Sequence, residues 1–220
     1  MAEVVGDGAS RLERRKARTR TALVRAAQSF IAEGKLNVPV LEITQAADVG
    51  MGSFYNHFES KEQLFQAAVD DAFEAHGNLL DRLTGDIDDP AEVFAHAFRL
   101  TGRLHRIEPE LCRVLLAHGS ALITSDQGLA PRALRDIESA TAAGRFTVAD
   151  PQVALALAAG AAVGLGQLLH DQPERDDAEA TDRMTEDILR AFGLPAEEAH
   201  RICQLPLPDL SSVASLGSVA

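Results

Sequence analysis

The sequence predicts an all-α protein, and three observations support this fold class. Apolar residues recur at helical spacing in most segments, the alternation of apolar and polar residues that marks a strand is absent, and Ser, Asp, Pro and Gly stand where helices begin and end. One Tyr and no Trp are available to β-structure. With 220 residues, 46% of them hydrophobic, the chain suits a small domain joined to a larger one and is too apolar to be disordered.

The expected helices follow one another with short connections and no visible internal repeat. Ser60 is an N-cap, and Gln63 completes an S-x-x-Q capping box. Asp-Pro pairs at 89–90 and 150–151 each place an N-cap carboxylate before a proline in the first turn. Glycines that mark helix ends stand at positions 34, 85, 144 and 193. About nine or ten helices are expected, among them 12–33, 40–47, 51–57, 60–84, 109–123, 131–143, 151–170 and 178–192, with another starting at Pro90.

The charges are divided unevenly along the chain. Between Arg11 and Lys61 there are nine Lys or Arg residues and five acidic ones, so this segment carries +4, and because the whole chain carries −12 the remainder carries −16. A basic segment on an acidic body can approach nucleic acid with one end only. A helix with a solvated charged face would give the same asymmetry, and charge alone does not separate the two interpretations.

Several classes of protein are not supported by the sequence. We find no apolar run approaching the roughly 18 residues of a membrane span, and the first ten residues lack the basic start and apolar stretch of a signal peptide. Cys112 and Cys203 cannot make a disulfide framework, so we expect a cytoplasmic protein. No two His residues are spaced i, i+4, and no catalytic motif is present, so we expect no metal, no cofactor and no enzymatic activity.

The most informative segment runs from Val40 to Lys61 and reads VLEITQAADVGMGSFYNHFESK. Two short helices joined by a turn of three or four residues form a helix-turn-helix, whose second helix can enter the major groove of DNA. Small residues let the start of that helix lie close to DNA, with free N–H groups facing phosphate; they are Gly50, Gly52 and Ser53. Donors and acceptors suited to base edges or backbone oxygens follow at Tyr55, Asn56 and His57. The structural alternative is a helical hairpin with an exposed Tyr.

At these residues the chain resembles the N-terminal domain of the TetR family of bacterial transcriptional regulators. The family pattern, x-Gly-Thr-Leu-Tyr-x-His-Phe-x-Ser-Lys-Glu-x-Leu, is met without gaps up to Leu64, and the resemblance covers about residues 12–75. It implies a three-helix DNA-binding head, a larger body that binds a ligand and dimerises, and repression relieved by a small molecule. Asp48 stands where the family usually has Gly, and Gly50 stands where it has a Ser N-cap. Asp tolerates the left-handed conformation of the turn and Gly is an acceptable N-cap, so we expect the geometry to be kept with slightly less stability.

The resemblance also implies which residues meet DNA. Phosphate contacts are expected from Tyr55, His57 and Lys61. The hydroxyl of Thr44 could reach a further phosphate. Lys61 lies in a first helical turn, where a cation is unfavourable for the helix dipole, which indicates an external anionic partner. The residues expected to face bases are Met51, Gly52, Ser53 and Asn56. The Arg-rich entry to the first helix, including Arg18 and Arg20, could reach the minor groove or flanking backbone, a merely solvated helix start being the alternative.

The helix from Pro151 to His170 contains three interior glycines, each of which costs about 1 kcal/mol relative to Ala and needs a packing reason. Gly160 and Gly164 lie one turn apart on one face, which suits close approach of another helix. The family dimerises through its last two long helices, so we expect a symmetric four-helix interface here, with packing inside the subunit core as the alternative. The residues expected in the interface are Val153, Leu157, Gly160, Gly164, Leu168, Met184, Ile188 and Phe192.

Polar residues interrupt otherwise apolar helix faces in the body, namely His76, His96, Thr101, His105 and His118, with Cys112 and Gln167 as weaker cases. A single His on an apolar stripe is more often a satisfied core residue than a ligand contact. Several of them on the helices with which the family encloses its effector indicate a pocket. The residues expected to line it are Phe73, His76, Phe94, Phe98, Thr101, Leu111, Leu115 and His118.

Together with the resemblance, which implies the dimer, the repression and its release, these observations predict a homodimeric repressor that binds double-stranded operator DNA, has no membrane partner and is released by a small-molecule effector. The effector is expected to press on the helix opened by Ser60 and so change the spacing of the two heads. The expected parts are a flexible arm over 1–10, a DNA-binding domain over 11–59, an effector-binding and dimerisation domain over 60–203 and a loosely ordered tail over 204–220. A helical ligand-binding or interaction module without DNA binding is the first alternative, and an enzyme of unrecognised type the second.

Overall fold

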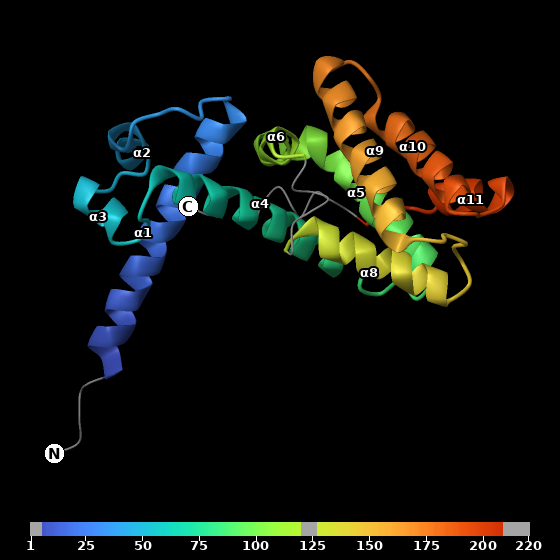
Figure 1. Cartoon of the computed structure of the whole chain (residues 1–220), viewed down its shortest axis with the longest axis horizontal. Helices are drawn as coiled ribbons and strands as arrows, with labels where there is room; N and C mark the ends of the chain where they lie inside the picture. The colour runs from blue at the N-terminus through green and yellow to red at the C-terminus, as the bar shows by residue number, and fades with distance from the viewer. Residues whose placement is uncertain (1–5, 120–126, 209–220) are drawn as a thin grey trace. The chain divides into compact units, whose positions relative to one another are not determined.

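The structure, a computed structural model, describes residues 6–119 and 127–208, with side chains from residue 11 onward (Figure 1). Within these residues it contains ten helices and no strand, so the predicted all-α class is confirmed. The helices are α1 (Gly6–Ala32), α2 (Val40–Ala46), α3 (Met51–Tyr55), α4 (Lys61–Thr84), α5 (Pro90–Ile107), α6 (Pro109–Ala117), α8 (Leu129–Ala142), α9 (Pro151–Asp171), α10 (Asp177–Ala191) and α11 (Ala196–Cys203).

Most expected helices begin and end within two residues of those observed. The exceptions are the start of α1, the end of α6 and the helix α11. α1 begins at Gly6, so part of the expected flexible arm is helical, while residues 1–5 lie outside the described residues. The helix expected over 109–123 ends at Ala117, and positions 120–123 lie outside the described residues. α11 is not among the expected helices, and the expected tail is described only as far as Pro208.

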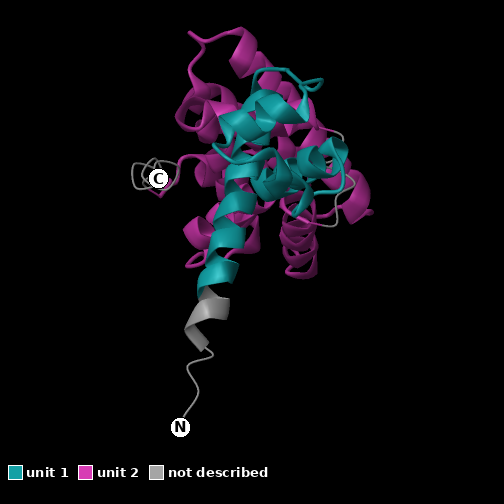
Figure 2. Ribbon diagram, turned by 90° about the vertical axis from the view of Figure 1, so that its left-hand side faces the viewer, with its two compact units in different colours: residues 1–72 teal, residues 73–220 magenta. Residues whose placement is uncertain are grey.

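The chain divides into two compact units, residues 1–72 (unit 1) and 73–220 (unit 2), shown in different colours in Figure 2. In unit 1, α1 packs on α2 and α2 on α3. The α2–α3 turn passes through Asp48, whose φ of 51° is left-handed, so the Asp accepts the conformation for which Gly is usual. Gly50 then takes the extended conformation of an N-cap, and the buried Phe54 anchors α3 to the core.

The start of α4 is capped as the Ser60–Gln63 pair predicts, with one difference. Ser60 Oγ accepts a hydrogen bond from the Gln63 backbone N–H at 3.1 Å. The Gln63 side chain accepts in return from the N–H of Glu59 at 2.6 Å, one residue earlier than in the usual capping box. The two bonds fix the point at which α4 begins.

Unit 2 is built around α5, which packs against α8, α9, α10 and α11. The predicted caps are present: Asp89 Oδ1 accepts from Ala91 N–H, and Asp150 Oδ1 accepts from the backbone N–H groups of Gln152 and Val153. The core contains packed rings from three different segments, Phe94, Phe146 and Phe192. Salt bridges from Arg99 and Arg103 to Asp182 join α5 to α10, each at 2.8 Å.

Two of the residues expected in the subunit interface belong to this core. Ile188 and Phe192 are only 3% and 1% exposed, because the apolar stripe of α10 packs on α5 and α11 within the same subunit. Their assignment to a dimer interface is therefore wrong. Met184, one turn earlier, is partly buried against the same core.

Candidate DNA interface, ligand pocket and subunit interface

The helix α3 presents one exposed face. Met51 and Tyr55, one turn apart, are 40% and 63% exposed although both are large apolar or aromatic side chains. Gly52 and Asn56 are exposed beside them, and Ser53 and His57 are half-buried. An exposed aromatic residue on a short helix with a free N-terminus suits contact with a nucleic acid backbone and groove.

Basic side chains lie close to α3 within unit 1. The guanidinium of Arg20 lies over the Phe58 ring, 4.7 Å from its centroid, which orients a cation next to the helix. Burial, together with the positive charges of Arg20 and Lys16, lowers the pKa of His57 below its ordinary value. Arg18 is exposed on the same helix, α1. The local field is thus positive, as an interface with phosphate requires.

Two of the predicted phosphate contacts need revision. Thr44 is 1% exposed and its hydroxyl donates to the carbonyl oxygen of Leu41 at 2.9 Å, so the prediction that it reaches a phosphate is wrong: the side chain faces the core of unit 1. Lys61 Nζ donates to Asn37 Oδ1 at 3.2 Å, so this ammonium already has a neutral partner within the chain. Lys61 remains half-exposed, and its contact with phosphate stays a prediction.

Unit 2 contains a partly open cavity of about 100 Å³, bounded among the described residues by the end of α4 and by α5, α6, α8 and α9. The predicted residues that line it are Phe94, Phe98, Thr101 and Leu115. The predicted residues outside its lining are Phe73, His76, Leu111 and His118. His76 is completely buried behind Thr101, with Nε2 3.1 Å from Thr101 Oγ1. Phe73 is buried where Gly128 passes too closely for any side chain.

On α6 the cavity is lined by Leu115 and Leu116, whereas Leu111 lies a turn earlier and His118 directs Nδ1 to the carbonyl oxygen of Val114 at 3.3 Å. The placement of Leu111 and His118 in the pocket is therefore wrong. His105, another of the polar residues that interrupt the apolar helix faces, does line the cavity. Gly166 of α9 makes room for it, because a Cβ there would lie 2.5 Å from His105 Cε1.

The sequence did not indicate the contribution of α8, α9 and the end of α4. The polar lining residues from these helices are Asp81, Thr84, Arg132 and Asp136. Alanines of α9 form much of the apolar wall, on the side of the helix opposite Gly160 and Gly164. The sequence showed that α9 is rich in small residues. It did not show that alanines on one face line the cavity while glycines on the opposite face are exposed.

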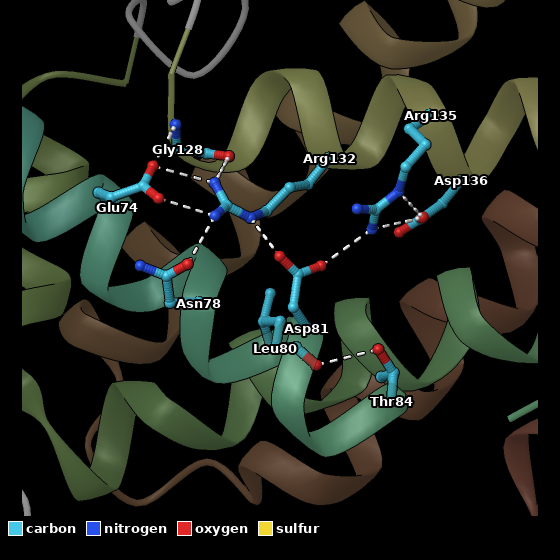
Figure 3. Close-up of polar contacts among 9 residues, drawn as sticks. All are labelled: Glu74, Asn78, Leu80, Asp81, Thr84, Gly128, Arg132, Arg135 and Asp136. Atoms are coloured by element: carbon cyan, nitrogen blue, oxygen red, sulfur yellow. Dashed lines mark hydrogen bonds and ion pairs between the residues drawn. The ribbon is translucent and has the colours of Figure 1, made fainter. Parts of the chain in front are cut away.

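A network of charged groups joins α4 to α8 (Figure 3), and three of its members, Asp81, Arg132 and Asp136, line the cavity. Arg132 of α8 donates through Nε to Asp81 at 2.6 Å and through Nη1 and Nη2 to the carboxylate oxygens of Glu74 at 3.0 and 2.8 Å. Arg135 links Asp81 to Asp136. The arginines lower the pKa of Glu74 and Asp81, whereas burial raises the pKa of Asp136.

The two histidines beside the cavity are neutral at ordinary pH. Burial, with a smaller contribution from neighbouring His105, lowers the pKa of His76 to about 3. Burial, with the nearby charges of Arg106 and His170, lowers the pKa of His105 to about 4. The cavity therefore offers no imidazolium to attract an anion.

The predicted face of α9 is exposed and apolar. Val153 and Leu157 are 65% and 49% exposed, and a Cβ added at Gly160 or Gly164 would meet no atom within 4 Å. Leu168 is half-buried at the end of the same face. By length and composition α9 could also cross a membrane, and 39% of its most apolar 18-residue segment is buried inside the structure. The expectation that no segment is long and apolar enough for a membrane span is therefore wrong.

Comparison with known proteins agrees with both units. The family model described as bacterial regulatory proteins, tetR family, matches residues 22–68, and that of the Tetracyclin repressor-like C-terminal domain matches residues 89–204. The chain is 34% identical to RolR in the crystal structure of its complex with the ligand resorcinol, with a TM-score of 0.69 and coverage of 90% of this chain and 99% of that one.

RolR without ligand gives 34% identity, a TM-score of 0.65 and coverage of 87% and 100%. A TetR-family transcription regulator from Shewanella sp. PV-4 shares the fold at 14% identity, with a TM-score of 0.71 and coverage of 80% and 99%. No match was found among curated proteins.

Proposed function

This chain belongs to the TetR family of bacterial transcriptional regulators, and on that premise we propose that it is a homodimeric repressor released from its operator by a hydroxylated one-ring aromatic effector. Regulators of this family bind operator DNA and small-molecule ligands and form dimers. They are soluble proteins of the cytoplasm rather than enzymes. The observation that carries the finer proposal is the small, mainly apolar cavity inside unit 2.

The size and lining of the cavity support the class of effector. An apolar cavity of about 150 Å³ accepts benzene, so a cavity of about 100 Å³ is of the size class of a single ring. Phe94, Phe98 and Leu115 provide apolar walls, and a few polar groups on one side can fix the orientation of a ligand. RolR, which is 34% identical, has as its ligand resorcinol, a single ring with two hydroxyl groups.

The exposed face of α9 supports the proposed dimer. Its opposite face packs on α5, α8 and α10, so within the described residues one side of the helix is left uncovered for a partner. Glycines at the centre of that side allow a second helix to approach closely, as in a symmetric helical interface. We assign the face to a second copy of the chain through Val153, Leu157, Gly160, Gly164 and Leu168, and we keep Met184 of α10, which is partly buried against the core, as a further interface candidate.

The experiment that tests the proposal measures binding of the full chain to a labelled duplex from upstream of its own gene, by fluorescence anisotropy, with and without resorcinol. We expect a sequence-specific complex with two subunits per site or a multiple of two. We expect resorcinol to weaken it about 5–150-fold, the usual range of allosteric coupling. Operator binding that no hydroxylated one-ring aromatic compound changes would overturn the proposed effector.

A further inference from the structure

We propose that the cavity selects a neutral effector by its hydrogen-bond donors: the protein side supplies acceptors, and the effector presents at least two O–H or N–H groups. The inference rests on the proposed function only in taking this cavity as the effector site. It comes from counting the donors and acceptors left unused by the polar residues that line the cavity in the described parts of the chain, which are Asp81, Thr84, Thr101, His105, Arg132 and Asp136.

The two threonines have only acceptor capacity left. A hydroxyl carries one hydrogen and two lone pairs. Thr101 donates its hydrogen to the carbonyl oxygen of Ala97, and Thr84 donates to that of Leu80, both at 2.9 Å. Because the hydrogen of Thr101 is used, the bond from His76 Nε2 at 3.1 Å has the imidazole as donor. Each threonine oxygen can therefore only accept a hydrogen bond from a ligand.

Arg132 has no donor left for a ligand. A guanidinium has five N–H bonds. In this network Nε donates to Asp81, Nη1 to Glu74 and the carbonyl oxygen of Gly128, and Nη2 to Glu74 and Asn78, at 2.6 to 3.0 Å (Figure 3). The cation that lines the cavity is thus fully engaged with its own chain, and a ligand carboxylate would have to break one of these bonds to be recognised.

The two carboxylates add further acceptors. The Asp81 oxygens each accept one bond, from Arg132 and Arg135, and retain other lone pairs. Both contacts of Asp136 with Arg135 go to Oδ1, which leaves Oδ2. The exception is His105, whose neutral ring carries one N–H and one acceptor nitrogen, enough for the oxygen of one ligand hydroxyl. An anionic ligand would meet acceptors almost everywhere.

The test is calorimetric titration of the full chain with four compounds of similar size: resorcinol, 1,3-diaminobenzene, 1,3-dimethylbenzene and 3-hydroxybenzoate. We expect the diol and the diamine to bind. We expect the dimethyl compound, although it is more apolar, and the benzoate to bind at least about tenfold more weakly than resorcinol. Equal or tighter binding of either would overturn donor selection and leave the effector site intact, whereas binding of none of the four would overturn the proposed effector site itself.

Three variants and a matched control locate the acceptors. Thr101→Val and Thr84→Val should each weaken resorcinol about tenfold and change binding of 1,3-dimethylbenzene little, while Thr101→Ser should retain affinity. Thr141→Val is the control, because this α8 threonine donates to the carbonyl oxygen of Ile137 at 2.8 Å and lies outside the cavity lining. Thr84→Val keeps the test valid if Thr101→Val unfolds, since Thr84 supports no histidine. Unchanged resorcinol affinity in Thr84→Val and Thr101→Val would contradict the inference.

Discussion

His76 is a fully buried histidine on α4 that lies outside the cavity lining, with its Nε2 3.1 Å from the hydroxyl of Thr101, which lines the cavity. Its Nδ1 has no hydrogen-bond partner in the described residues, and its pKa is lowered to about 3. The sequence placed it in the pocket because a polar residue interrupts an apolar stripe. The apolar stripe does show that the residue is buried. Whether a buried residue lines the cavity or lies behind a residue that does depends on the positions of the neighbouring helices.

The depressed pKa of His76 predicts an acid-dependent loss of stability. The unfolded chain protonates this ring below its ordinary pKa of 6.5, whereas the folded chain resists protonation until about pH 3. Stability therefore falls as pH drops through this window, by up to about 1.4 kcal/mol per pH unit. His76→Gln should flatten the slope of unfolding free energy between pH 6 and 4, measured by urea denaturation, whereas His200→Gln, at an exposed position, should not. Equal slopes in His76→Gln and the parent would contradict this.

Lys61 provides a residue-level test of the DNA interface. If it contacts phosphate in both subunits, Lys61→Ala should make the dependence of log affinity on log salt shallower by about two per dimer. Lys35→Ala is a matched control in unit 1, since it removes the same charge from an exposed lysine paired with Glu33 at 2.6 Å. Operator titrations at several salt concentrations give the slopes. A slope unchanged by Lys61→Ala would assign this lysine to its Asn37 contact alone.

The exposed surface of the helix-turn-helix was predictable where the relevant structure is local. The exposure of Met51 and Tyr55 follows from five residues of helix and one turn. Thr44 was misplaced because its burial depends on how α1 covers α2, which no local pattern encodes. The cavity shows the same limit, since Arg132, which lines it, is held by Asp81, a residue 51 positions away.

At the scale of elements, α9 and α10 were both predicted as helices. The face of α9 that was expected in an interface is exposed, whereas the corresponding face of α10 is buried. The exposed glycines of α9 could be recognised because three glycines in one helix need a close neighbour. The apolar stripe of α10 was equally clear, but a stripe does not say whether it is covered by the same subunit or another. Ile188 and Phe192 are covered by the same subunit. The unexpected helix, α11, carries its apolar residues on less than three turns, too few for a firm pattern.

The α9 face predicts a specific change in oligomeric state. Gly164→Leu adds a side chain where the subunit itself has nothing within 4 Å, so the monomer should fold, while a second helix would be pushed away. Sedimentation velocity should show a dimer for the parent and a monomer for the variant. Ala142→Leu, at an exposed position near the end of α8, is the control and should remain dimeric. A dimeric Gly164→Leu protein would show that these glycines do not meet a partner.

For the whole molecule, the helix α4 has a part in both units. It begins at Lys61 beside the helix-turn-helix and ends at Thr84, which lines the cavity. Arg132 holds three of its side chains, Glu74, Asn78 and Asp81, from α8. An effector bound against this network would shift operator binding only to the extent that it favours one arrangement of α4 over another. Operator DNA must then weaken effector binding by the same factor.

Arg132→Lys should reduce the factor by which effector and operator weaken each other's binding, while leaving the operator affinity of the effector-free protein nearly intact. Lysine keeps the charge but has three N–H bonds on one nitrogen, too few to hold Glu74, Asn78, Asp81 and the Gly128 carbonyl together. We expect the ratio of operator dissociation constants with and without resorcinol to fall toward one. Arg201→Lys, which alters an ion-paired arginine outside the cavity lining, should preserve the ratio. If Arg132→Lys lowers operator affinity equally with and without effector, the network stabilises unit 2 and carries no signal from the cavity.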